Sequence, residues 1–502
     1  MSFSVTDFFS MADFYSGAVF WFWLTLFSIA VVIFFERRNP STTMTWLLLL
    51  ILLPVVGLVM YFVFGENLRK KNSKKIQKMK DALLKADDTR AAYDLVYQIE
   101  EQKKWLDSEA SDAFFNRDDK QAIRLLLNSG NTPVTMGNDL KIFEEGISKF
   151  EKLLEDISKA EKHIHMEYYI IKDDNMGNRL REALIERARA GVKIKILYDP
   201  IGCYPLLITR RHFFGSMRAE GIEIFAFMQD KRLYYRNINY RNHRKIAIID
   251  GKVGYLGGIN IGDEYVHEDP RFGFWRDTHL RFEGNAVVML QMVFLQDWYH
   301  RTGRSEFRKS YFHLFYEPKG PTTVQIVASG TDSEHPTIYQ SFFYNITHAQ
   351  QSVYIQSPYF VPDEALLMAL KSAVLSGVDV KIMFPGIPDH FTVYHASQSY
   401  LSEIAELGAK VYIYKKGFIH SKVMMVDHEF ASVGTANMDV RSFKINAEIN
   451  ALIYDDETLC HLYDMFDRDL RNCELLDPNV YLNKTIRRRF VEGACRLFSP
   501  IL

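Results

Sequence analysis

An internal duplication restricts the fold of this chain more than any other feature. The apolar, strand-like segments 164–171 and 353–360 are each followed by a helical pattern, a glycine and a second β-branched strand. The two glycines are Gly191 and Gly377, and each ends the helical pattern of its copy. A strand, a helix, a glycine stop and a further strand are typical of a βαβ unit. The sequence therefore predicts an α/β fold with two similar halves that pack as a pseudo-twofold pair around one site.

The spacing of the duplicated segments also indicates where the halves differ. The helical patterns cover 177–190 and 363–376, and the next glycines, Gly221 and Gly408, are separated by almost the same interval as the first pair. The interval between the two copies is about ten residues shorter for the histidine motifs, described next, than for the glycines. The first half therefore carries about ten extra residues between Gly221 and its histidine motif, around Arg232–Arg241. Because the insertion is confined to one half, we interpret it as a candidate substrate loop.

Both halves carry the pattern H-x-K-x4-D, followed after six residues by G-[GT]-x-N. Its members are His243, Lys245, Asp250 and Asn260 in the first half, and His420, Lys422, Asp427 and Asn437 in the second. A single copy is a weak signal, whereas two copies at the same place in a repeat are a strong one. We therefore treat these eight residues as the candidate site.

The spacing within the motif suits chemistry at a phosphodiester. A histidine and a lysine two residues apart on a strand project from the same face. One neutral imidazole can attack phosphorus while the other protonates the leaving alcohol. Cationic and amide groups stabilise the phosphoryl oxygens, which assigns phosphate binding to Lys245, Asn260, Lys422 and Asn437. A metal centre is disfavoured, because lysine is a poor ligand and no carboxylates are grouped with either histidine.

Residues 1–65 have the composition of a membrane segment. They contain only five charged side chains, and the runs 14–35 and 41–65 contain none. A helix of ~20 apolar residues crosses a bilayer, and both runs exceed that length, so residues 1–65 are predicted to form a two-helix transmembrane hairpin. A cleaved signal peptide is the competing interpretation. It is disfavoured because the segment before Phe14 carries two acids and no base.

A basic segment follows the predicted hairpin. Seven basic residues lie within positions 68–80, and five of them are Arg69, Lys70, Lys71, Lys74 and Lys75. The positive-inside rule then places the rest of the chain on the cytoplasmic side of the membrane. The same side chains are predicted to contact anionic lipid head groups. Residues 66–133 are interpreted as this juxtamembrane segment and a helical linker.

Composition excludes several other classes of protein. The net charge is −1, which argues against a dedicated nucleic-acid binder. The four cysteines show no C-x-x-C spacing, so neither a structural zinc site nor a disulfide framework is expected. The sequence also lacks a G-x-x-x-x-G-K-[ST] phosphate loop.

The paired motifs resemble those of the phospholipase D superfamily. With the N-terminal hairpin, the chain is similar to the bacterial cardiolipin synthases over essentially its whole length. Further segments that carry the resemblance are 36–46, 53–57, 64–67, 275–279 and 499–502. The resemblance implies two phospholipase D-type lobes, which we place at 134–320 and 321–502, with a single site at their interface and no metal or cofactor.

The resemblance also implies a reaction. A histidine takes the phosphatidyl group of one phosphatidylglycerol and releases glycerol, and a second phosphatidylglycerol then accepts the group to give cardiolipin. In many members the first-motif histidine is the nucleophile, which assigns that role to His243 and the acid/base role to His420. The reverse assignment stays open because the motifs are nearly symmetric. The implied enzyme is a multi-pass protein of the bacterial cell membrane with cytoplasmic lobes.

Acidic residues that orient the histidines lie some 25 to 35 positions downstream in the family, where this chain has Asp277 and Glu448. Asp250 and Asp427 belong to the catalytic motifs, and we interpret their role as bracing the strand and its turn. Many relatives have serine at the position of Gly258, so a hydroxyl contact is expected only from Thr435 in the second half.

Other functions fit parts of the pattern. A membrane-bound phospholipase D would share the first half-reaction and transfer the group to water. Phosphatidylethanolamine could replace phosphatidylglycerol as the donor. A nuclease is disfavoured by the neutral charge and the hairpin, and a catalytically silent scaffold by the intact motifs.

Overall fold

The computed structural model describes residues 19, 21–27, 29–30, 40–52, 56–57, 60–61, 99–227, 239–330, 333–477, 479 and 484–499. The chain forms two compact units, Met1–Leu68 with Gln229–Asn239 and Arg69–Met228 with Tyr240–Leu502. The second unit contains both copies of the histidine–lysine motif. The basic residues Arg69, Lys70, Lys71, Lys74 and Lys75, and the insertion up to position 238, lie outside the described residues.

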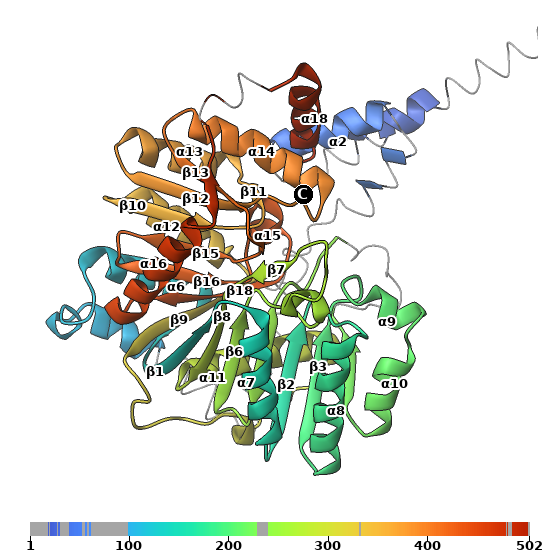
Figure 1. The fold of residues 1–502 in the computed structure, drawn as a ribbon, viewed down its shortest axis with the longest axis vertical. Coiled ribbons are helices and arrows are strands. Elements are labelled where there is room, and N and C mark those ends of the chain that lie inside the picture. Colours follow the sequence, from blue (N-terminus) through green and yellow to red (C-terminus); the bar gives the residue numbers. More distant parts are fainter. Residues whose placement is uncertain are drawn as a thin grey trace, which may run out of the picture. The chain divides into compact units, whose positions relative to one another are not determined.

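The predicted duplication is visible in the order of strands in one large sheet (Figure 1). The first half supplies β1 (Val134–Phe143), β2 (His163–Tyr168), β3 (Lys193–Tyr198), β4 (Glu223–Ala226), β5 (Lys245–Ile249), β6 (Val253–Gly257) and β8 (His279–Glu283). The second supplies β9 (Thr322–Ser329), β10 (Ser352–Gln356), β12 (Asp379–Pro385), β13 (Lys410–Tyr414), β15 (Val423–Val426), β16 (Phe430–Gly434), β18 (Glu448–Ile453) and β19 (Cys473–Leu475).

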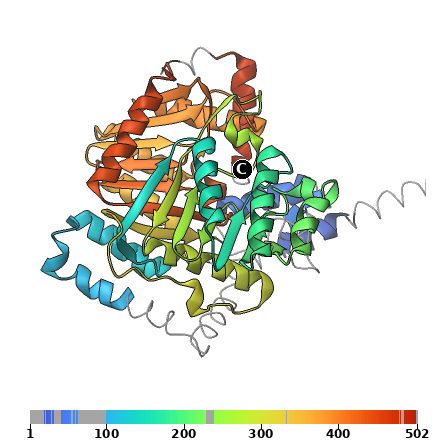
Figure 2. The same cartoon turned by 60° about the horizontal axis from the view of Figure 1, so that its bottom comes forward.

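The halves meet at β1 and β9, which pair antiparallel in the middle of the sheet. Outward from this pair, the first half runs β1-β8-β6-β5-β2-β3-β4 and the second runs β9-β18-β16-β15-β10-β12-β13, with β19 added at the edge. Each strand therefore has a counterpart at the same place in the other half. Figure 2 shows the strands of both halves side by side with helices on the two faces.

One face of the sheet carries a core that both halves share. It lies under α11 (Ala286–Thr302) and α16 (Asp456–Leu470) and includes Ile246 and Ile248 of β5. The opposite face has a separate core for each half. In the first half, α7 (Gly146–Ser158), α8 (Asn175–Arg189) and α10 (His212–Ala219) cover Ala247 and Ile249. Alternate residues of β5 thus face opposite layers, as the period of two requires.

The corresponding core of the second half lies under a different set of helices. These are α6 (Arg117–Gly130), α12 (Thr337–His348), α13 (Glu364–Leu375) and α14 (Phe391–Ala405). Shorter or peripheral elements of the unit are η1 (Glu109–Ser111), α9 (Tyr204–Ile208), η2 (Asp263–Val266), η3 (Lys309–Tyr311), α15 (Val440–Lys444) and α18 (Ile486–Leu497). The predicted α/β fold with duplicated halves is therefore confirmed.

The helices of the duplicated units begin and end through equivalent contacts. The side chain of Asp174 accepts from the amide of Gly177 at the start of α8, and Asp363 accepts from the amide of Leu366 at the start of α13. After each helix, Gly191 and Gly377 adopt φ values of 92° and 96°, which favour glycine. The first helix starts two residues before the predicted position 177, because Asp174 caps it.

The first unit contains α2 (Pro40–Leu52), where Trp46 and Leu50 pack with Tyr61. The rings of Trp46 and Tyr61 meet edge to face with centroids 5.5 Å apart. Within the described parts of the chain, none of the helices combines the length and apolarity needed to cross a membrane.

Candidate active site

Two backbone crossings between the halves place the motif histidines. The strand β14 (Gly417–Ile419) pairs in parallel with β7 (Phe274–Arg276), and the amide of His420 donates to the carbonyl of Arg276 at 2.7 Å. In the other copy, Asn242 forms an isolated parallel β-bridge with Ala447. The amide of His243 donates to the carbonyl of Ala447 at 2.9 Å. Each histidine is thereby fixed beside the residue that precedes an acid of the opposite half.

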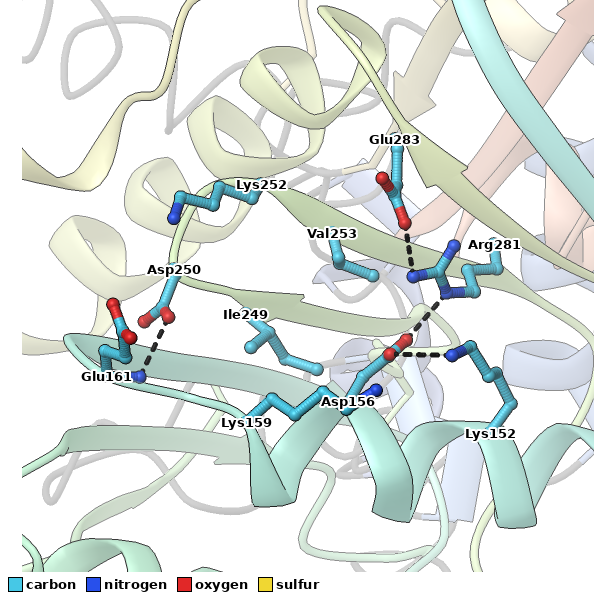
Figure 3. A pocket seen from close by; sticks show the side chains of 10 residues that line it. All are labelled: Lys152, Asp156, Lys159, Glu161, Ile249, Asp250, Lys252, Val253, Arg281 and Glu283. Carbon is cyan, nitrogen blue, oxygen red and sulfur yellow. Dashed lines mark hydrogen bonds and ion pairs between the residues drawn. The ribbon is translucent and has the colours of Figure 1, made fainter. Parts of the chain in front are cut away.

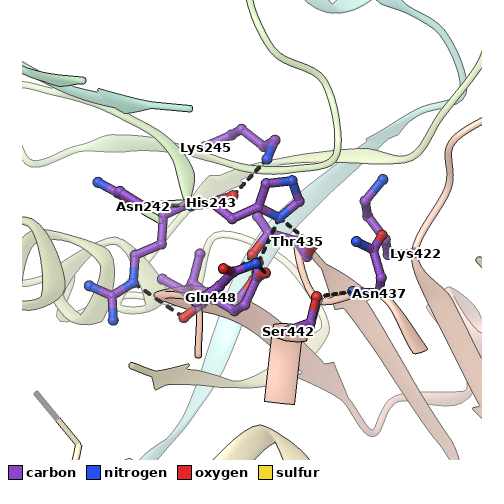
Figure 4. A network of polar contacts seen from close by, with 12 residues as sticks. Asn242, His243, Lys245, Lys422, Thr435, Asn437, Ser442 and Glu448 are labelled. Atoms are coloured by element: carbon purple, nitrogen blue, oxygen red, sulfur yellow. Dashed lines mark hydrogen bonds and ion pairs between the residues drawn. The ribbon is translucent and has the colours of Figure 1, made fainter. Parts of the chain in front are cut away.

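The acids consequently pair with the histidines in a crossed arrangement. Glu448 Oε2 lies 2.9 Å from Nδ1 of His243, and Asp277 Oδ2 lies 2.8 Å from Nδ1 of His420. Both carboxylates are fully buried. Figure 4 shows Glu448 beneath the ring of His243. The site therefore draws each histidine–carboxylate pair from both halves, which the downstream spacing of the two acids did not reveal.

The two imidazoles differ in what surrounds Nδ1. Around His243, Nδ1 meets two acceptors, Glu448 and the carbonyl of Thr435 at 3.1 Å. It must therefore carry the proton, which leaves the lone pair on Nε2. Around His420, Nδ1 lies 2.8 Å from the Asp277 acceptor and 2.8 Å from the ammonium of Lys422. The tautomer of His243 is thus fixed more strictly than that of His420.

Burial keeps both histidines neutral in the unliganded protein. Desolvation lowers the pKa of His243, against the opposing effect of Glu448. Desolvation, with the ammonium of Lys422, lowers the pKa of His420 to about 4. The carboxylates stay ionised. Burial raises the pKa of Asp277, but Lys422 and His420 lower it further, so that it lies below its usual value. His243 and Lys245 have the same net effect on the pKa of Glu448. Neutral imidazoles beside carboxylates are suited to nucleophilic and acid–base roles.

The two lysines are buried beside the histidines. The ammonium of Lys245 donates to the carbonyl of His243 at 2.6 Å, and that of Lys422 donates to the carbonyl of His420. Burial lowers the pKa of Lys245 to about 7 and that of Lys422 to about 8, although Glu448 and Asp277 oppose the shift. An anion between the two ammoniums would favour their charged forms. The pair is therefore poised to receive a phosphate group.

The two motif asparagines are not equivalent. Both polar atoms of the Asn260 side chain have hydrogen-bond partners within the protein. Its Oδ1 accepts from the amide of Ile170 at 3.1 Å, and its Nδ2 donates to the hydroxyl of Tyr265 at 3.0 Å. The side chain of Asn437 is buried, and its Oδ1 has no hydrogen-bond partner among the described residues. Its backbone amide donates to Ser442 (Figure 4). Asn437 therefore keeps more hydrogen-bonding capacity for a ligand.

The motif aspartates lie away from the histidines. Asp250 follows the far end of β5, about 16 Å along the strand from Lys245 at roughly 3.3 Å per residue. With φ values of 54° and 53°, Asp250 and Asp427 accept backbone amides from the loops before β2 and β10. The donors are Glu161, Lys162 and His163 at 2.8–2.9 Å, and Gln350, Gln351 and Ser352 at 2.6–2.7 Å. Their inclusion among the catalytic residues is not supported by this geometry, which favours the bracing role.

A charged pocket of about 310 Å³ opens beside Asp250 (Figure 3). Lys152 and Arg281 approach its floor, where Asp156 accepts from the guanidinium at 2.6 Å and from the ammonium at 3.2 Å. The pocket belongs to the first half alone and contains neither motif histidine. It therefore forms no part of the candidate active site.

Comparisons with known proteins identify the family. A family model described as "Cardiolipin synthase, PLD-like domain" matches residues 153–269 and 343–470, and "Phospholipase_D-nuclease N-terminal" matches residues 23–66. A cardiolipin synthase of Alkalihalophilus pseudofirmus is 41% identical over 96% of this chain and 93% of its own length. The chain belongs to the cardiolipin synthase family.

Further relatives agree with this assignment. The "Major cardiolipin synthase ClsA" of Bacillus subtilis is 42% identical over 96% of this chain and 98% of its own length. The crystal structure of a phosphatidylserine synthase from Haemophilus influenzae covers 76% of this chain and 100% of its own, with a TM-score of 0.59 at 15% identity. That structure supports the fold alone. The resemblance inferred from the paired motifs is confirmed.

In this member of the family, two buried ion pairs support the acids and were missed by sequence reasoning. Arg244 pairs with Asp297 of α11 and donates Nε to the carbonyl of Glu448 at 3.2 Å. Arg276 pairs with Asp469 of α16 at 2.8 Å and donates to the carbonyl of Asp277. Each arginine therefore holds the backbone of one acid. The only sequence signal was their position next to site residues.

Aromatic rings enclose the two histidines. The ring of Tyr169 meets that of His243 edge to face at 5.1 Å, and Trp275 lies 5.2 Å from His420. The side chains of His243 and His420 are only 12% and 10% exposed. Surroundings of this kind limit the access of water to the reacting groups.

Gly258 occupies a position that excludes any side chain. A Cβ atom at this residue would lie 2.0 Å from Oδ1 of Asp277. In the other half, Thr435 uses its hydroxyl to accept from the amide of Ile449 at 2.9 Å. The absence of a hydroxyl from the first copy therefore leaves room for the carboxylate that faces His420.

Proposed function

We propose that the chain is a cardiolipin synthase that transfers a phosphatidyl group from one phosphatidylglycerol to another and releases glycerol. The single observation that carries the proposal is the pair of crossed contacts, His243 with Glu448 and His420 with Asp277, in one buried site with two lysines. The electrostatic influence of Lys422 on His243 and of Lys245 on His420 supports one shared site. The family membership supports phosphatidylglycerol as the substrate.

The fixed tautomer supports His243 as the nucleophile. Its Nε2 lone pair attacks phosphorus, the bond from phosphorus to the glycerol oxygen breaks, and His420 gives that oxygen a proton. The anionic phosphodiester raises the pKa of His420 when it binds, so that the proton is present. The free hydroxyl of a second phosphatidylglycerol then gives its proton to His420 and attacks phosphorus. The bond to His243 breaks and cardiolipin leaves.

Lys245, Lys422 and Asn437 would bind the phosphoryl oxygens during both steps. Two cations stabilise the charge that builds on these oxygens in the transition state. The low exposure of the histidines favours a lipid alcohol over water as the acceptor. One phosphodiester replaces another, so the reaction needs no nucleotide.

The proposal includes the organisation of the chain. Residues 1–65 form a two-helix transmembrane hairpin, 66–133 a basic segment and linker, and 134–320 and 321–502 the two lobes, which lie on the cytoplasmic side of the bacterial cell membrane. The uncharged runs 14–35 and 41–65 support the hairpin. The basic residues after it support the orientation and a contact with anionic lipid head groups.

Product analysis tests the proposed reaction. Purified protein would receive phosphatidylglycerol as its only lipid, and mass spectrometry would follow lipids and free glycerol. We expect cardiolipin and glycerol to rise in a one-to-one ratio, and the His243→Ala, His420→Ala double variant to form neither. Phosphatidic acid with glycerol would instead make the protein a phospholipase D. Cardiolipin that forms only after phosphatidylethanolamine is added would make that lipid the donor.

The lysines make the reaction sensitive to alkaline pH. Because His420 must carry a proton and its pKa in the free enzyme is about 4, kcat/KM already declines with pH. We expect this decline to steepen past about 7 to 8, where Lys245 and Lys422 also lose their protons. Since bound phosphate raises both pKa values, kcat at saturating lipid should fall only at higher pH. Initial rates between pH 6 and 10 would measure both curves. A kcat/KM whose slope against pH does not change between pH 6 and 10 would contradict the role of the lysines.

A further inference from the structure

The helix α18 (Ile486–Leu497) contacts the body of its unit through Val491 and Cys495, which pack against the core of the second half, and through charged groups. Glu492 is buried and accepts from Lys484 at 2.7 Å and from Arg488 at 3.0 Å. Lys484 also donates to Ser402 of α14 at 2.7 Å. The inward face of this helix thus combines charged contacts with apolar packing.

Charged contacts continue at the C-terminal end of the helix. Arg496 pairs with Glu403 of α14 at 2.6 Å, and its guanidinium lies 4.0 Å from the ring of Tyr400. The hydroxyl of Ser499 is 3.2 Å from that of Tyr400. These contacts hold α18 in one orientation on α14.

The outward face of the same helix is apolar. Ile486, Phe490 and Leu497 are 86%, 75% and 80% exposed. At ~100° per residue, these three positions lie within about 40° of one another around the helix axis. Arg487 and Arg489 fall on either side of this stripe, about 80° from its centre.

A helix on a soluble surface has one apolar stripe, which faces the core, whereas α18 packs Val491 and Cys495 inward and carries a second apolar stripe on its outward face. Three of the five basic side chains in residues 484–499 pair with Glu492 and Glu403, and Arg487 is exposed beside the stripe. An apolar stripe beside the exposed Arg487 complements a bilayer surface, with hydrocarbon below and phosphate groups at the level of the basic side chain.

We propose that the outer face of α18 inserts into the interface of an anionic lipid bilayer, as a second membrane contact in addition to the N-terminal segment. This inference extends the proposed function and rests on it, since phosphatidylglycerol is itself an anionic lipid. Ile486, Phe490 and Leu497 lie roughly 5–10 Å below the head groups. Arg487 contacts the phosphates.

A fluorescent depth measurement on the full-length protein tests the contact. In a Cys460→Ser, Cys473→Ser background, Phe490→Cys would carry an NBD fluorophore, and Tyr316→Cys, which is 91% exposed in the first half of the body, would be the matched control. Both proteins would be reconstituted into vesicles of phosphatidylglycerol and phosphatidylethanolamine. Nitroxide groups on the lipid chains would quench from the membrane, and iodide would quench from water.

We expect nitroxide lipids to quench the label at position 490 at least about threefold more than the label at 316, and iodide to quench it less. Equal quenching by iodide at the two positions would overturn the proposal. Protection from iodide without nitroxide quenching would also overturn it, because a protein surface would then cover the helix. Neither readout requires turnover, so a failure of the proposed reaction would leave this result interpretable.

An activity measurement provides a second test. The variant Ile486→Ser, Phe490→Ser, Leu497→Ser changes only exposed side chains and should fold normally. On vesicles we expect its KM for phosphatidylglycerol to rise about tenfold with kcat unchanged, as weaker contact with the bilayer requires. The control variant Phe114→Ser, Tyr316→Ser, Leu375→Ser removes exposed apolar groups elsewhere and should leave KM unchanged. Equal KM values for the two variants would contradict the proposal.

Discussion

Replacing His243 with alanine is expected to lower kcat for phosphatidyl transfer by roughly 10⁴-fold or more, because the proposed covalent intermediate forms on its Nε2 atom. Replacing His420 should also suppress transfer from phosphatidylglycerol, since the glycerol oxygen then leaves without a proton. The two losses differ in origin. His243 supplies a lone pair to phosphorus, whereas His420 supplies a proton to the leaving group.

A substrate with a good leaving group separates the two roles. Phosphatidyl-p-nitrophenol releases p-nitrophenolate, which needs no proton. The His420→Ala variant should therefore give a burst of p-nitrophenol and accumulate phosphatidylated enzyme, detected by intact-protein mass spectrometry. The His243→Ala variant should give neither. If the burst appears in His243→Ala and disappears in His420→Ala, the roles of the two histidines are reversed.

The second large effect is expected at the buried acids. Glu448→Gln and Asp277→Asn keep the size of each side chain but remove the charge that holds Nδ1–H of the facing imidazole. We expect each variant to lower kcat by roughly 10³-fold, because the wrong tautomer becomes accessible and the imidazolium is no longer stabilised. Initial rates with phosphatidylglycerol would measure the loss, with thermal unfolding as the control for folding.

The same p-nitrophenyl substrate tests the crossed pairing. Since Glu448 faces His243, Glu448→Gln should weaken the p-nitrophenol burst as the loss of the nucleophile does. Asp277 faces His420, so Asp277→Asn should retain the burst and fail only with phosphatidylglycerol. The opposite assignment of these two phenotypes would mean that each acid serves the histidine of its own half.

Much of the architecture was predictable because it repeats along the chain. The offsets between Gly191 and Gly377 and between the two motifs indicated two equivalent halves, and the strands follow the same order in each. The residues after Lys245 and Lys422 are apolar in both copies, and they form the buried strands β5 and β15. Local patterns of this kind depend on neighbouring residues, which the sequence displays directly.

The motif spacing located the histidines and lysines but not their relation to the acids. Asp277 and Glu448 were found by their distance downstream, whereas their partners depend on β7 meeting β14 and on Asn242 meeting Ala447. These contacts join residues that lie far apart along the chain, and no local periodicity encodes them. The difference in hydrogen bonding between the side chains of Asn260 and Asn437 likewise depends on a tertiary contact, because Tyr265 lies beside Asn260 and accepts a hydrogen bond from it.

The sequence by itself determined the duplication, the paired motifs and the kind of chemistry they allow, because residue type and short-range spacing fix these properties. Only the tertiary structure decided which acid faces which histidine, which backbone amides Asp250 and Asp427 accept, and that α18 carries an apolar stripe on its outward face. Each of these depends on strand pairing and helix packing between distant segments. Such contacts form when the whole unit folds, since their free energy comes from burial that a single segment cannot achieve alone.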